Sequence, residues 1–128
     1  MGSTAEVTIS IQRWDEQPCG DKLTRASVAQ ELSGDIEGEA AVEWLMCYRP
    51  DETAEFVGLQ RVTGRLGERE GSFVLVHSGG SFDGKAATAE LAVVEGSASG
   101  ELEGLRGSGE FSAPRGGTPS LTLDYDFE

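Results

Sequence analysis

The chain has 128 residues, with 23 acidic side chains against 10 basic ones and a formal net charge of −13 at pH 7. A chain of this length fits a single domain with one hydrophobic core. So negative a charge repels phosphate backbones and anionic lipid surfaces, which argues against nucleic-acid and membrane partners.

Cysteine and histidine content limits the chemistry that the chain can support. The segment "MGSTAEVTIS" lacks the basic and apolar regions of a signal peptide, so we expect a cytoplasmic protein in which Cys19 and Cys47 are free thiols. Neither cysteine belongs to a CxxC pair, and His77 is the only histidine, so a four-ligand zinc site cannot be assembled. We expect neither a metal nor another cofactor.

Short runs of alternating apolar and polar residues, separated by turn residues, follow one another along the whole chain. They predict eight strands, at 4–14, 22–32, 36–48, 56–66, 71–78, 86–94, 101–112 and 120–128. The segment "DEQPCGD" at 15–21 is predicted to be the first turn, and its acidic residues are predicted to be solvated.

The run at 36–48 has the clearest alternation, with glutamates on one face and Trp44, Met46 and Tyr48 on the other. Alternation with one polar face indicates an antiparallel sheet, and short turns indicate a meander. We therefore predict an all-β fold, a single up-and-down barrel of eight mainly antiparallel strands spanning residues 1–128. A sandwich of two sheets is the alternative.

Five stretches occur in an order that resembles a known family: "RWDE", "SGDIEGE", "FVGLQRVTG", "GSFVLVHSGG" and "GSASGELEGLRG". The family comprises small bacterial proteins of unknown function, and the likeness runs from Ala5 to Phe127. The resemblance implies a barrel of the allene oxide cyclase type, or a lipocalin-like one. It transfers no catalytic residues, and the active-site motif of the plant cyclases is not recognisable in this chain.

Charged residues on one face of each predicted strand place the opposite face in the barrel interior. This predicts His77 and Tyr48 as catalytic residues, because an imidazole exchanges protons near neutral pH. The predicted ligand-binding residues are Trp44, Met46, Phe56, Gln60, Phe73 and Tyr125. We expect Trp44, Tyr48, Gln60, His77 and Tyr125 to line one continuous cavity. The alternative for His77 is a hydrogen-bonded structural residue.

Two functions remain. The first is a small-molecule-binding barrel that acts as a cofactor-independent isomerase or cyclase on a small apolar metabolite, and the resemblance favours it. The second is a non-catalytic protein for small-ligand binding or assembly. The sequence leaves the oligomeric state open, a homo-oligomer included.

Overall fold

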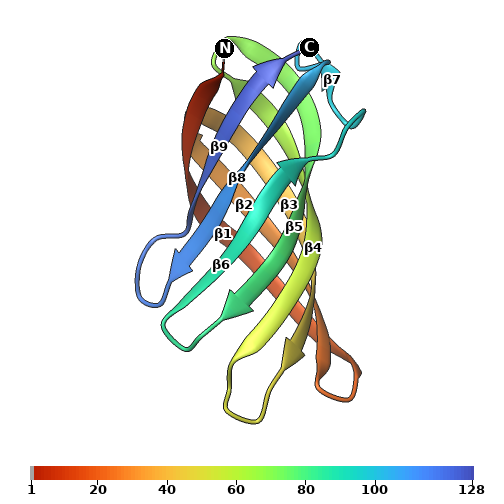
Figure 1. Cartoon of the computed structure of the whole chain (residues 1–128), viewed down its shortest axis with the longest axis vertical. Helices are drawn as coiled ribbons and strands as arrows, with labels where there is room; N and C mark the ends of the chain where they lie inside the picture. The colour runs from red at the N-terminus through yellow and green to blue at the C-terminus, as the bar shows by residue number, and fades with distance from the viewer. Residues whose placement is uncertain (1) are drawn as a thin grey trace.

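The computed structural model describes residues 2–128, and nearly all of this chain is β-strand (Figure 1). The nine strands are β1 (Ser3–Gly20), β2 (Leu23–Gly34), β3 (Ile36–Tyr48), β4 (Ala54–Leu66), β5 (Arg69–Phe82), β6 (Ala86–Val93), β7 (Ser99–Gly100), β8 (Leu105–Pro114) and β9 (Ser120–Phe127). No helix among these residues is long and apolar enough to cross a membrane.

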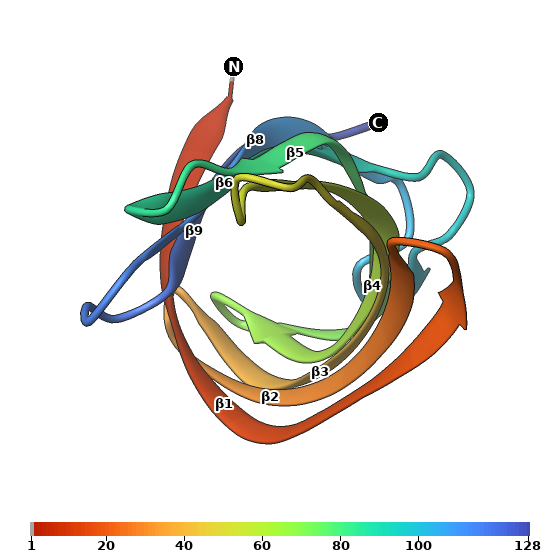
Figure 2. The same cartoon turned by 90° about the horizontal axis from the view of Figure 1, so that it is seen from below.

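Eight of the strands form a closed antiparallel barrel, as the alternation predicts. Neighbours along the barrel are β1 to β6 in order, followed by β8 and β9, and β9 pairs with β1 to close the ring. The view from below shows this ring (Figure 2). Strand β7 lies outside it and pairs only with β5, where Gly71 faces Gly100 and Ser72 faces Ser99. The sandwich alternative is therefore excluded.

Three predicted boundaries are wrong by four residues or more, one of them the end of β5, which runs to Phe82 instead of residue 78. The predicted turn at 15–21 is strand, because β1 stays paired with β2 as far as Gly20 and the chain reverses only at Asp21 and Lys22. Pro18 is tolerated there because β9 pairs with β1 only up to Thr8, so no second ladder needs its missing N–H. The strand predicted from residue 101 begins only at Leu105, after a turn.

A bulge at Gln12 changes which residues of β1 face the interior. Before the bulge, buried Ile9 pairs with buried Leu32, whereas after it Trp14 pairs with buried Val28. An extra residue shifts the alternation by one position. The even-numbered residues of the second half of β1, Trp14 among them, therefore face inward.

Inward side chains of all eight barrel strands make one hydrophobic core. At the end that carries the termini, the turn before β8 contributes Leu102, which is buried in the core and packs beside Gly71. The opposite end carries the β1–β2, β3–β4, β5–β6 and β8–β9 hairpins (Figure 1). We call this the hairpin end.

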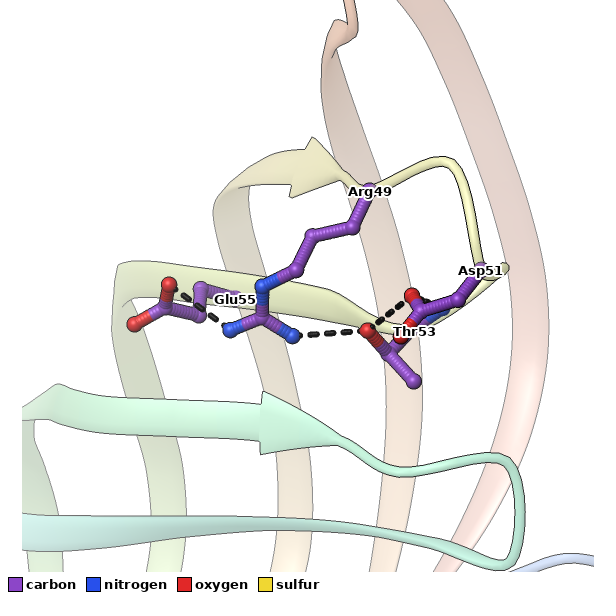
Figure 3. A network of polar contacts seen from close by, with 4 residues as sticks. All are labelled: Arg49, Asp51, Thr53 and Glu55. Carbon is purple, nitrogen blue, oxygen red and sulfur yellow. Dashed lines mark hydrogen bonds and ion pairs between the residues drawn. The ribbon is translucent and has the colours of Figure 1, made fainter.

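The β3–β4 hairpin has its own polar network (Figure 3). The Asp51 carboxylate accepts hydrogen bonds from the Thr53 hydroxyl at 2.6 Å and from its backbone N–H at 3.1 Å. The Arg49 guanidinium donates to that hydroxyl at 2.7 Å and pairs with Glu55 at 2.8 Å. Hydrogen bonds from Thr53 lower the pKa of Asp51. This network fixes the turn, and its two acidic residues are exposed to solvent.

Candidate functional site

His77 lies in the middle of a chain of buried polar side chains that crosses the barrel interior. The Trp44 indole Nε1–H donates to His77 Nδ1 at 3.2 Å, and His77 Nε2 lies 3.0 Å from Gln60 Oε1. The Gln60 amide then donates to Gln30 Oε1 at 2.6 Å. An indole can only donate, so Nδ1 carries no proton. The proton of the neutral ring is therefore on Nε2, which donates to Gln60.

The environment of His77 keeps the ring uncharged. The side chain is 1% exposed, and burial lowers its pKa from 6.5 to about 4. Desolvation penalises the protonated imidazole, and no carboxylate in the chain of hydrogen bonds compensates it. Both ring nitrogens are already hydrogen-bonded, so the folded protein leaves neither of them for a ligand.

Aromatic rings enclose this histidine. The Trp44 indole packs at centroid distances of 5.6 Å from Phe56 and 5.7 Å from His77, Phe111 and Trp14. Edge-to-face and tilted contacts at this range are favourable for aromatic pairs. Together the rings fill the interior toward the hairpin end.

A second polar group lies at the hairpin end, centred on Glu16. Its carboxylate accepts hydrogen bonds from the Tyr48 hydroxyl at 2.6 Å, the Thr24 hydroxyl at 2.7 Å and the Trp14 indole at 3.0 Å. Partial burial would raise the pKa of Glu16, but these three donors outweigh it and the pKa is lowered. The pKa of Tyr48 is raised by burial and by its bond to the Glu16 carboxylate. Glu16 is thus a weak base and Tyr48 a weak acid.

The predicted site residues are only partly brought together. Trp44, Phe56, Gln60 and His77 are buried and adjoin one another, and half-buried Met46 and Tyr48 lie at the hairpin end. Phe73 is buried in the core.

Tyr125 does not join them. It packs against Phe127 near the C-terminus, at the end of the barrel away from Tyr48 (Figure 1). The side chains between the two tyrosines fill the interior, so the predicted continuous cavity through these residues is not formed. Strand alternation places side chains on a face, but it does not say how much space they occupy.

Trp14 and Glu16 are the site residues that sequence reasoning missed. The sequence predicts Glu16 in a solvated turn, yet its side chain faces inward and accepts a hydrogen bond from Tyr48. The signal is present in "RWDEQP", where Trp14, Glu16 and Pro18 alternate with Arg13 and polar residues. Only the bulge at Gln12 makes this set the inward one.

The grooves found on the described part of the chain lie on the outer wall or among the loops at the termini end. One groove of about 400 Å³ lies over β2–β5, and its lining includes apolar side chains that point outward together with Met46 and Phe56. We call Leu23, Leu45, Val57 and Leu59 the outer apolar patch. Within residues 2–128, no group of three or more histidine, cysteine, aspartate or glutamate side chains could hold a metal ion. Cys19 and Cys47 are free and exposed.

The depressed pKa of His77 predicts that the fold weakens in mild acid. Above pH 6.5 the ring is neutral in both states, so His77 contributes no pH dependence. Below that pH the unfolded chain binds a proton that the folded chain excludes, until the pH reaches about 4. The free energy of unfolding is expected to fall by about 1.4 kcal/mol per pH unit, about 3 kcal/mol in all.

Urea unfolding at pH 7, 6 and 5 measures this loss, and most of that range lies above the titration of ordinary carboxylates. His77→Gln is the control, since an amide can accept from Trp44 and donate to Gln60 without titrating. Equal slopes for wild type and His77→Gln between pH 6.5 and 5 would contradict the prediction.

The comparisons with known proteins agree with this fold. The model of the family DUF3224, described as a protein of unknown function, matches residues 3–125. A crystal structure of a DUF3224 protein from Shewanella oneidensis MR-1, also of unknown function, has a TM-score of 0.85 and 26% sequence identity, covering 100% of this chain and 98% of that one. The search of curated proteins gave no match. With the same closed barrel and a family match over nearly its whole length, the chain belongs to the DUF3224 family.

Proposed function

We propose that this protein is a non-catalytic binding barrel that takes a small apolar molecule on its outer apolar patch. The observation that carries the proposal is the outer apolar patch beside a groove on the barrel wall, and the state of the ionisable groups facing the interior is what argues against catalysis. The pKa of His77 lies at about 4, that of Glu16 is lowered and that of Tyr48 is raised. General acids and bases work best with a pKa near the working pH, and all three groups have moved away from neutrality.

The outer apolar patch offers an exposed apolar surface to a ligand, whereas the interior of the barrel is filled by side chains. Leu45 and Val57 are directly paired across β3 and β4, and Leu59 lies two residues further along the same face. These three side chains are 52–53% exposed. Contiguous exposed apolar side chains on a soluble chain are characteristic of binding sites. The adjoining groove of about 400 Å³ is of the size that small-molecule sites occupy.

A cofactor-independent isomerase or cyclase of the allene oxide cyclase type is our alternative proposal. Tyr48, hydrogen-bonded to Glu16 at the hairpin end, is the side chain that such an activity would use, because it is half-buried rather than enclosed. Turnover that is lost in Tyr48→Phe would favour the enzyme over the binding protein.

A neutral fluorescent probe, N-phenyl-1-naphthylamine, tests the binding proposal without charge repulsion from the acidic protein. Wild type is expected to enhance the fluorescence of the probe saturably. Leu45→Gln combined with Leu59→Gln is expected to weaken probe binding by about tenfold, because the patch loses two apolar side chains. Val94→Gln is the matched control, since Val94 is also exposed but lies outside the patch.

All variants are first checked for the native circular dichroism spectrum and melting temperature. Probe binding that survives the double substitution, or that Val94→Gln weakens equally, would remove the outer apolar patch as the site. If the probe does not bind saturably to wild type, the outer apolar patch is likewise removed as the site.

A further inference from the structure

The second half of β1 is an unprotected strand edge. Strand β9 pairs with β1 only from Ser3 to Thr8, and one more backbone bond joins Ile9 N–H to Pro119. From Ser10 onward β1 is paired with β2 alone. Free strand edges are templates for pairing with another chain, and natural proteins usually shield them. Pro18 lies near the end of the strand and the bulge at Gln12 lies before Trp14, so neither of them removes the free edge around Trp14.

The backbone of Trp14 points toward this free edge. In a strand, residues whose side chains share a face also share the direction of their N–H and C=O groups. Ile9 faces the interior, and its N–H points toward β9. Trp14 also faces the interior, where its ring packs on Trp44, so its N–H and C=O point to the same side. On that side β9 is no longer present.

The outer face of the same segment carries complementary charges. Arg13 and Asp15 flank Trp14 and pair with Ala29 and Ser27, on the outward face. Neither forms an ion pair within the part of the chain that the structure describes. An antiparallel copy of the strand centred on Trp14 would place each Arg13 opposite the Asp15 of the other copy. Opposite charges in that relation stabilise strand pairs, and like charges destabilise them.

We propose that two copies of this chain dimerise by antiparallel pairing of their β1 edges about Trp14. The pairing is centred on Trp14, after the bulge at Gln12, and the two-fold axis passes between the two Trp14 residues. Trp14, which is 45% exposed in the single chain, lies beside its own counterpart in the dimer. The proposal does not depend on the outer apolar patch, which lies on the face of β2–β4 rather than on an edge.

Charge reversal tests the pairing. Sedimentation equilibrium of the full chain is run at 0.15 M salt, where the repulsion between acidic surfaces is screened beyond about 8 Å. Wild type is expected to be a dimer. Arg13→Asp places two like-charged pairs across the axis and is expected to weaken dimerisation by about tenfold. Asp15→Arg places two pairs of positive charges across the axis and is expected to weaken dimerisation to the same extent. The double variant Arg13→Asp/Asp15→Arg restores opposite charges and is expected to recover the wild-type dissociation constant.

Lys85→Asp, in the exposed β5–β6 turn, is the control for net charge alone and is expected to leave the dimer intact. All variants are first checked for the native circular dichroism spectrum, and recovery in the double variant then assigns the loss in the single variants to the charge pairs. A monomeric wild type would overturn the proposal. This holds even if the β1 edge is then found to pair with a peptide of another protein. The proposal would also be overturned if Lys85→Asp weakened dimerisation as much as Arg13→Asp does. It would be overturned too if the double variant dimerised more weakly than either single variant.

Discussion

Replacing His77 with alanine is expected to lower the free energy of unfolding by about 4 kcal/mol, because the substitution combines a cavity with two orphaned polar groups. The imidazole is 1% exposed and in contact with the rings of Trp44 and Phe111. Its loss leaves the Trp44 N–H and the Gln60 carbonyl oxygen without partners in a dry interior. Urea unfolding at pH 7 measures the loss.

The matched control for this prediction is His77→Gln, which keeps one acceptor and one donor near Trp44 and Gln60. His77→Gln is expected to lower the free energy of unfolding by less than half as much as His77→Ala does. A catalytic or ligand-binding His77 with no structural role predicts the reverse pattern, in which alanine leaves the stability within about 1 kcal/mol of wild type and abolishes binding. That result would refute the structural role.

Replacing Gly58 with alanine is expected to lower the free energy of unfolding by about 3 kcal/mol through overpacking. Gly58 lies on β4 between Trp44 on β3 and His77 on β5, directly opposite both in the register. A Cβ atom there would lie 2.6 Å from Trp44 Cδ1 and would overlap the backbone oxygen of Glu43. The backbone oxygen cannot move without disturbing the β3–β4 ladder, so the strain is not relieved by a rotamer change.

Gly20→Ala is the control, because a Cβ at Gly20 meets only the flexible Leu23 side chain, at 3.4 Å. The two variants are compared by thermal and urea unfolding, and Gly20→Ala is expected to stay within about 0.5 kcal/mol of wild type. Similar stabilities for both variants would mean that the space between Trp44 and His77 is not occupied as described.

The sequence alone determined the barrel and the direction of most side chains. In 36–48 the polar positions point outward and the alternate positions inward, and β3 has the bounds that the alternation predicts. His77 faces inward for the same reason. A residue's neighbours two positions away share its face in any extended strand, so this information is local and can be read from the chain.

Only the tertiary structure decided what the inward side chains do. The Gln12 bulge, which turns Trp14 and Glu16 inward, depends on the register between β1 and β2 rather than on either strand alone. The hydrogen bonds of His77 join β3, β4 and β5, and a donor or acceptor on another strand leaves no trace in the local pattern. The filled interior and the unpaired β1 edge likewise follow from strand lengths and packing around the whole ring, because space and pairing are properties of the assembled barrel.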